Sequence, residues 1–132
     1  MAGVILPYKI SSCELAAYKV SAYFISQGYS TDVKKIEDNG YCVYIFHESF
    51  IKNIIGTPSV IKASFYPLDD TTGIEVKTSY VEVNAGNIVK EALSTALIVP
   101  GIFKIRKLAT LKKEVKKRVL IEAQKLKVEE RL

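Results

Sequence analysis

The sequence predicts an α+β fold of two layers, in which helices pack on one face of a four-stranded antiparallel meander. Three features predict it: an amphipathic helical pattern comes first, four strand-like segments separated by turn residues follow, and a long run without Pro or Gly ends the chain. Helices and strands that are segregated along a chain usually pack as separate layers. A chain of 132 residues fits one domain of this kind. The expected order is helix, four strands, helix and helix.

The first helix is expected between Ser12 and Gln27, where apolar residues recur at steps of three and four. Ser11 or Ser12 can cap its start, because a serine hydroxyl accepts a hydrogen bond from a free backbone N–H. Gly28 can end the helix, since glycine adopts the left-handed conformation that is common there.

Four strands are expected next. The first two, residues 29–38 and 41–48, flank Asn39-Gly40, a dipeptide that supplies the positive φ angles of a two-residue hairpin turn. The second of them is apolar from Tyr41 to Phe46, which is typical of a strand covered on both faces. The other two strands are expected at residues 60–66 and 73–83, joined by a segment rich in turn residues.

Two more helices are expected after the strands. Asn84 can cap a helix that runs to Leu97 and stops before Pro100. Residues 102–131 contain no Pro or Gly and are rich in good helix formers, so they predict a long last helix. We therefore assign residues 1–101 to an α+β body. Residues 102–132 form a helix that belongs to the same domain or extends from it.

The last helix is expected to carry an apolar stripe on one side. At about 100° per residue, six side chains share one face of it: Ile105, Leu108, Leu111, Val115, Val119 and Leu126. About 30 residues give a rod of about 45 Å, which is long beside a radius of gyration of about 14 Å. The helix is thus expected to overhang its domain and to bind a protein partner or a second copy through the stripe.

The basic residues of this helix suggest an alternative. Residues 101–132 hold 11 Lys and Arg against 4 Asp and Glu, whereas the preceding residues hold 8 against 10. A solvated face explains such a pattern, and so does binding to an anionic membrane or nucleic acid. The residues expected to bind anions are Arg106, Lys107, Lys113, Lys116, Lys117 and Arg118.

Catalysis is not expected. The one histidine, His47, lies at the end of an expected strand, and no local signature surrounds Cys13 or Cys42. Three scattered Cys and His residues are too few for a zinc site, and Asp69-Asp70 fits a turn better than a calcium loop. The isolated glycines form no phosphate-binding motif. We therefore expect no enzyme activity, metal, cofactor or small-molecule substrate.

A cytoplasmic location is expected, with the inner face of a membrane as the alternative. The apolar run from Val4 to Leu6 is short and has no positive region before it, so it does not resemble a secretory signal. Two reduced cysteines suit a reducing compartment. Residues 92–103 carry no charge but are too few to cross a bilayer, which needs about 20 apolar residues. They are expected to lie on the sheet or in a membrane interface.

Short features spread over most of the chain resemble a group of small bacterial domains of unknown function. They are Asn39-Gly40, the Ile55-Gly56 turn before the third strand, and Leu97-Ile98-Val99-Pro100 before the last helix. In that group an apolar helical pair follows the helix and four strands, and it often lies at a membrane. The resemblance implies the same order of elements but no activity. Here the apolar segment is shorter and holds Lys90 and Glu91, and the last helix is longer and more basic.

Overall fold

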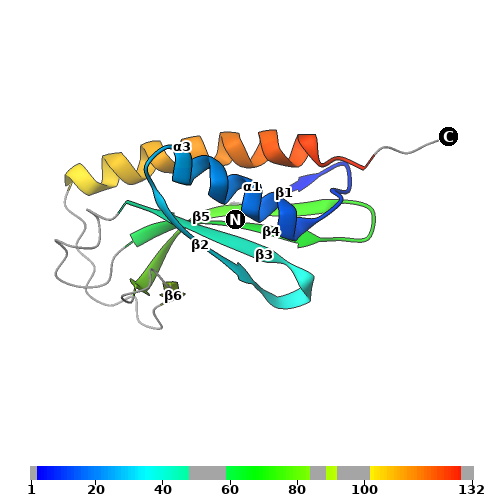
Figure 1. The fold of residues 1–132 in the computed structure, drawn as a ribbon, viewed down its shortest axis with the longest axis horizontal. Coiled ribbons are helices and arrows are strands. Elements are labelled where there is room, and N and C mark those ends of the chain that lie inside the picture. Colours follow the sequence, from blue (N-terminus) through cyan, green and yellow to red (C-terminus); the bar gives the residue numbers. More distant parts are fainter. Residues whose placement is uncertain (1–2, 48–58, 84–88, 92–101, 129–132) are drawn as a thin grey trace.

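The computed structural model describes residues 3–47, 59–83, 89–91 and 102–128, with side chains at 3–47, 60–81 and 108–128. Both α-helices of these residues lie on one face of an antiparallel sheet, and α3 runs along its length (Figure 1). The predicted α+β class with helices on one face is confirmed.

The sheet has five strands in the order β1-β5-β4-β3-β2, and a short β6 pairs with β5 alone. Along the chain the elements are β1 (Gly3–Leu6), α1 (Cys13–Ser26), β2 (Ser30–Lys35), the 3-10 turn η1 (Glu37–Asn39), β3 (Tyr41–Phe46), β4 (Ser59–Pro67), β5 (Thr72–Val83), β6 (Val89–Glu91) and α3 (Ile102–Lys125). All pairings are antiparallel, and β2 to β5 form the expected meander.

Two parts of the predicted order are wrong. The chain adds β1 to the meander as a further strand, with Val4 opposite Ile74 of β5. Residues 89–91 of the expected second helix form the strand β6 instead. The rest of that expected helix, and most of the uncharged segment 92–103, lie outside the described residues. The described part of the chain therefore holds two α-helices, where three were expected.

The start and end of α1 follow the prediction. The Ser12 hydroxyl accepts a hydrogen bond from the backbone N–H of Leu15 at 3.0 Å, which caps the helix. Gly28 follows the helix with a φ of 91°, a conformation that side-chain-bearing residues seldom adopt.

The β2–β3 hairpin is confirmed, but its turn lies one residue earlier than predicted. Positive φ angles occur at Asp38 (58°) and Asn39 (60°), and the Gly40 N–H donates to the Glu37 carbonyl at 3.1 Å. This is the pattern of a two-residue turn with Asp38 and Asn39 at its centre. Gly40 has an ordinary φ of −79°, and glycine is needed there for space, because a Cβ would lie 2.9 Å from the Phe65 carbonyl oxygen.

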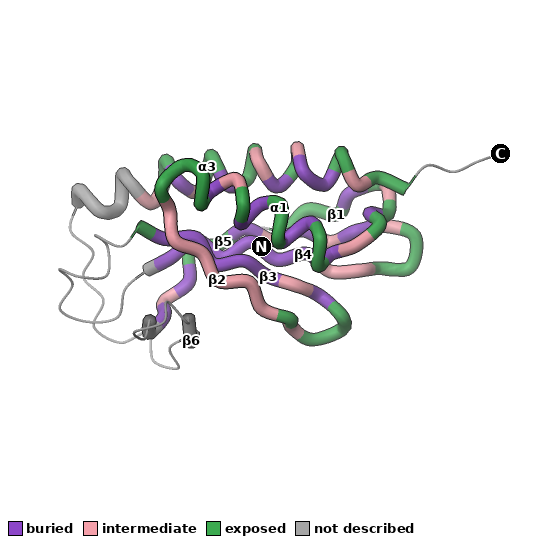
Figure 2. The backbone as a smooth tube through the Cα atoms, viewed as in Figure 1, coloured by how far each residue is buried: buried purple, intermediate pink, exposed green. Residues whose placement is uncertain are grey.

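The main core lies between the helices and the sheet (Figure 2). Its buried side chains include Ala16, Val20 and Phe24 of α1, Val43, Ile45, Ile61, Phe65 and Val76 of the sheet, and Leu111, Val115 and Val119 of α3. A smaller cluster on the other face of the sheet contains Cys42, Tyr44, Phe46, Val60 and Val81. Five of the six residues of β3 are therefore buried, which confirms that this strand is covered on both faces.

The length of α3 matches the length of the sheet. Its 24 residues span about 36 Å at about 1.5 Å each. The 12 residues of β5 span about 40 Å at about 3.4 Å each. The helix therefore has a strand of similar length to pack on, and α3 shares one core with residues of the body.

Candidate binding surface on α3 and the β1 edge

The apolar stripe of α3 faces the protein's own core. Leu111 is 2% exposed, and Val115 and Val119 are fully buried. Leu108 and Leu126 are partly buried and pack against the same cluster. The side chain of Ile105 lies outside the described residues. The expected use of the stripe as an exposed partner-binding surface does not hold for the described side chains, because the sheet and α1 already cover them.

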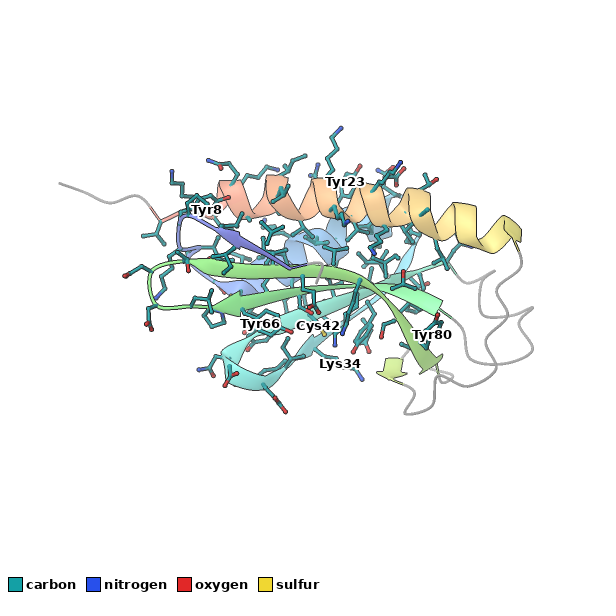
Figure 3. The ribbon with its side chains drawn as sticks, turned by 180° about the vertical axis from the view of Figure 1, so that it is seen from behind. Tyr8, Tyr23, Lys34, Cys42, Tyr66 and Tyr80 are labelled. Carbon is teal, nitrogen blue, oxygen red and sulfur yellow. The ribbon has the colours of Figure 1, made fainter. Side chains whose placement is uncertain are left out.

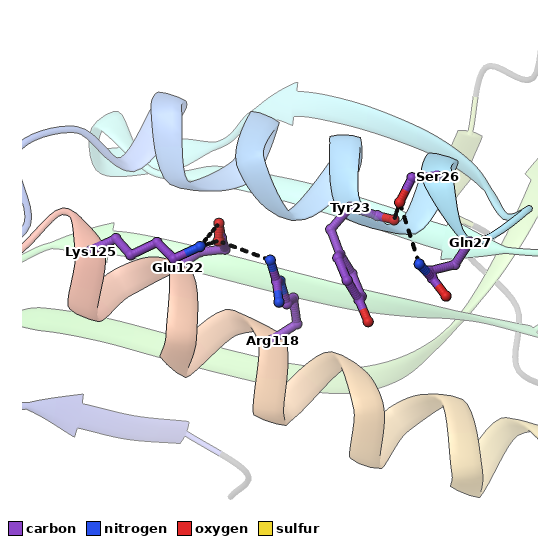
Figure 4. Close-up of polar contacts among 6 residues, drawn as sticks. All are labelled: Tyr23, Ser26, Gln27, Arg118, Glu122 and Lys125. Atoms are coloured by element: carbon purple, nitrogen blue, oxygen red, sulfur yellow. Dashed lines mark hydrogen bonds and ion pairs between the residues drawn. The ribbon is translucent and has the colours of Figure 1, made fainter.

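One flank of α3 faces α1, and we call it the α1 flank. The Arg118 guanidinium lies over the ring of Tyr23 in α1, with its carbon 3.9 Å from the ring centroid (Figure 4). Arg118 Nη2 also lies 3.7 Å from Glu122 Oε2, and Lys125 Nζ approaches the same oxygen at 3.4 Å. The Glu122 side chain is only 6% exposed. Arg118 was expected to bind an external anion, but its charge serves this contact between the helices.

Glu114 belongs to the same flank. Burial raises the pKa of the Tyr29 hydroxyl, and the negative charge of Glu114 raises that pKa further. Tyr29 comes three residues after the end of α1 and packs edge-on against Phe24 of that helix. The two acidic residues of α3 within residues 108–128, Glu114 and Glu122, thus both lie on the α1 flank.

The opposite flank of α3 carries only positive charge. With Val115 directed at the sheet, a turn of about 100° per residue places Glu114 on one side of the helix and Lys116 on the other. Lys112 and Lys113 fall on the same side as Lys116, and Lys127, two residues past the end of the helix, lies on this side too, near Tyr8. We call these four lysines the basic flank. None of the described acidic residues forms an ion pair with Lys113, Lys116 or the outward-facing Lys117.

The basic flank is on the side of β1. The helix α3 lies between α1 on one side and β1 on the other (Figure 4). The strand β1 is an edge of the sheet. Lys127 Nζ lies 5.3 Å from the ring centroid of Tyr8, which follows β1. The Val128 N–H donates to the Lys9 carbonyl at 2.8 Å, and the Ser11 N–H donates to the Leu126 carbonyl at 2.8 Å. These bonds hold the end of α3 against the chain that links β1 to α1.

An apolar crevice separates the basic flank from the sheet. It has a volume of about 150 Å³ and is lined by Val4, Ile74, Val76, Lys116 and Leu120, and we call it the edge crevice. Val4 is 54% exposed and Leu120 is 45% exposed. The crevice is therefore an open apolar site beside several lysines.

Sequence reasoning included Lys113, Lys116 and Lys117 but missed the edge crevice. Its strand residues come from β1, which the sequence did not reveal, and from β5. Leu120 could have indicated the crevice from the sequence, because it is an apolar residue outside the apolar stripe, on the polar side of the helix. Arg106 and Lys107 lie in α3, and their side chains are outside the described residues.

The helix-free face of the sheet holds a second cavity. It has a volume of about 330 Å³, and its lining consists of Ile36, Glu37, Asp38, Lys62 and Tyr66. Figure 3 shows Lys34, Cys42 and Tyr66 on this side of the sheet. Lys62 is 8% exposed, and its Nζ lies 5.6 Å from the ring centroid of Tyr44. Carboxylates and an ammonium group both line this cavity, so it shows no preference for ligands of one charge.

The groups considered for catalysis do not come together. His47 packs edge-on against Tyr29, with ring centroids 6.0 Å apart, at the end of β3. Cys13 begins α1, whereas Tyr29 follows its end, so the length of the helix separates Cys13 from His47. Cys42 belongs to the cluster on the other face of the sheet. Both cysteines are buried, and neither forms a disulfide bond. Burial raises the pKa of the Cys13 thiol, and the positive charge of Lys9 opposes that shift in part.

The described residues show no group of three His, Cys, Asp or Glu side chains that could hold a metal ion. Within the same ranges, no helix has both the length and the apolar character needed to cross a membrane. Comparison with known proteins found no matching family, no matching curated protein and no matching solved structure. The resemblance to small bacterial domains therefore stays a prediction.

Proposed function

We propose that the chain is a non-enzymatic interaction module that binds an acidic protein partner through the outer surface of α3. The observation that carries the proposal is the sorting of charge around this helix. Both acidic residues of its described part, Glu114 and Glu122, lie on the α1 flank, and the basic flank faces the β1 edge. A surface of one sign attracts partners of the opposite sign and speeds their association.

The surface proposed here differs from the one that the sequence suggested. The apolar stripe packs in the core, so the binding energy must come from the lysines and from apolar groups beside them. Leu120 and Val4 supply such groups, since both are about half exposed. Buried apolar contacts contribute affinity, and charge complementarity mainly contributes specificity and rate.

The same lysines support a second candidate function. Binding to the phosphates of an anionic membrane or of nucleic acid needs a basic surface without acidic residues, which the basic flank provides. Each lysine near an anionic leaflet contributes about 1 kcal/mol. Such binding does not require the apolar groups of the crevice.

Charge-neutralising variants test the proposal. The triple variant Lys112→Gln, Lys113→Gln and Lys116→Gln removes three charges from the basic flank. A control, Lys19→Gln, Lys35→Gln and Lys77→Gln, removes three exposed charges from α1, β2 and β5. Both variants have the same net charge, so a general charge effect would alter them equally.

The probes are poly-L-glutamate, a 20-base-pair DNA duplex and vesicles rich in phosphatidylglycerol, each measured at low and at physiological salt. We expect poly-L-glutamate to bind at low salt, with affinity lost in the first variant and kept in the control. Binding to DNA or vesicles without binding to poly-L-glutamate would favour the second candidate. Absence of binding to all three probes at low salt would refute both.

A further inference from the structure

The two edges of the sheet differ in a way that matters for binding. The edge strand β2 carries Asp32, Lys34 and Lys35, and charges of this kind discourage another strand from pairing with an edge. The opposite edge strand, β1, has no charged residue in Gly3–Leu6. Its Val4 and Ile5 are 54% and 68% exposed. Charged residues thus protect the β2 edge against strand addition, and β1 itself carries none.

The outer edge of β1 offers backbone groups to a ligand. Each residue of a strand carries a donor and an acceptor, and β1 pairs with β5 on one side only among the described strands. Extended peptides often bind proteins by pairing with such an edge, where backbone hydrogen bonds supply affinity and pockets select alternate side chains.

The edge crevice lies where a selecting pocket would be needed. Val4 pairs with Ile74, and both side chains line the crevice on the side of α3. A strand added to β1 would direct every second side chain to that side. One apolar side chain could therefore enter the space of about 150 Å³ beside Leu120.

The positive charge around the crevice determines which side chains of a bound strand fit next to its apolar anchor. Lys116 lines the crevice itself, and Lys112 and Lys113 lie on the same flank of α3. Side chains two positions away from the apolar anchor would point at these lysines, since residues two apart share a face of a strand. Acidic residues fit those positions.

We propose that the partner contributes an extended segment that pairs with β1, places one apolar side chain in the edge crevice and directs flanking carboxylates at the basic flank. This inference rests on the proposed function and narrows it to one kind of partner. A second copy of the chain fits less well, because pairing two β1 strands edge to edge would bring two basic flanks together. DNA and lipid headgroups cannot form the backbone pairing.

The test uses a fluorescein-labelled peptide, Gly-Glu-Val-Leu-Thr-Glu-Gly, in which the two Glu and the Leu share one face when extended. The control peptide has the same sequence with methyl groups on the backbone nitrogens of Val and Leu. The N–H groups of neighbouring residues in a strand point to opposite sides, so one of these two faces β1. Methylation of both nitrogens therefore removes the N–H group that would bond to β1. On the protein, Leu120→Asp places a repelling charge at the crevice, and Leu15→Asp is the control, because Leu15 is 42% exposed on α1.

We expect the parent peptide to bind with salt-dependent affinity. Backbone methylation and Leu120→Asp should each weaken it by roughly tenfold, the effect of losing about one well-formed hydrogen bond or contact. Leu15→Asp should leave it unchanged. Amide hydrogen exchange followed by NMR should show slower exchange in Gly3–Leu6 when the peptide is bound.

Three outcomes would overturn the inference. Strand addition is refuted if the methylated peptide binds as well as the parent, or if the β1 amides exchange equally fast with and without the peptide. Binding of poly-L-glutamate to the basic flank would in that case still support the proposed function. If neither the peptide nor poly-L-glutamate binds, both proposals fail. If sedimentation shows a dimer that the Ile5→Lys substitution dissociates but added peptide does not dissociate, a second copy of the chain occupies the β1 edge.

Discussion

Replacing Arg118 with methionine should destabilise the protein through the contact between α1 and α3. The substitution removes the guanidinium that lies 3.9 Å from the Tyr23 ring centroid and 3.7 Å from the Glu122 carboxylate. Methionine keeps much of the apolar length of the arginine side chain. Among the described residues, Glu122, whose side chain is 6% exposed, would then keep only Lys125 as an ion-pair partner, and Lys125 is itself 61% exposed. The variant thus leaves a buried carboxylate with a weak, solvent-screened partner.

The size of the effect follows from burial. Removing one partner of a buried ion pair costs about 3–5 kcal/mol. Arg118 is 24% exposed, and its Nε is buried with no hydrogen-bond partner among the residues that the structure describes, so both facts reduce the loss. We expect a decrease of about 2 kcal/mol in the free energy of unfolding. For a chain of this length the unfolding entropy is about 0.28 kcal/mol per kelvin, so Tm should fall by about 7 °C.

The measurement is a double-mutant cycle with Glu122→Met, by urea unfolding followed through circular dichroism and by calorimetry. Replacing both partners with apolar residues removes the unpaired charge, so the double variant should lie within about 1 kcal/mol of the unsubstituted protein. Lys117→Met, on the outer face of α3, should change stability by less than about 0.5 kcal/mol. If the double variant loses the sum of the two single losses, Arg118 and Glu122 are not coupled and the reasoning fails.

Three further predictions concern single sites. Ser64→Ala should leave stability unchanged or raise it by up to about 1 kcal/mol, because the buried hydroxyl has no hydrogen-bond partner within the described part of the chain. A loss above about 1 kcal/mol in urea unfolding would reveal a bond to it. Gly40→Ala should cost about 1–3 kcal/mol through the 2.9 Å approach to Phe65, whereas Asn39→Gly, at a positive φ, should cost nothing measurable by the same method. Burial holds the pKa of Cys13 above its usual value. The folded protein thus binds the proton more tightly, so stability should fall as pH rises through the pKa of the unfolded thiol, and iodoacetamide should react faster in urea than in buffer.

The sequence carried enough information for the elements that have a strong local pattern. α1 has a helical period with a serine cap and a terminal glycine, and all three appear as expected. β3 is apolar without interruption, and five of its residues are buried. In each case the signal lies within a few consecutive residues.

Features that depend on distant partners could not be predicted in this way. β1 is four residues long with one buried side chain, so it has no period to recognise, and it exists because β5 is long enough to pair with it. The turn was assigned to Asn39-Gly40 from its typical residues, but contact with Phe65 of β4 decides what Gly40 does. That contact is invisible in the local sequence.

The part of α3 with described side chains is covered and does not overhang, for a related reason. The length of the helix was compared with the radius of gyration of an average chain, whereas the element that it packs on is a 12-residue strand. Strands gain more than twice the length per residue of helices. A sheet of this length covers the stripe, so the flanks of the helix are the surfaces left to bind a partner.

The charge pattern of α3 reduces the stability of the helix itself. Lys112 and Lys116, and likewise Lys113 and Lys117, are four positions apart and carry like charges, which costs about 0.2–0.5 kcal/mol for each pair. An acidic residue at one position of each pair would convert this cost into a gain of similar size. The helix uses both of its described acidic residues on the α1 flank and leaves the side next to β1 without one. A partner that supplies carboxylates to the basic flank would add attractions that offset this repulsion, and the gain would appear only in the complex.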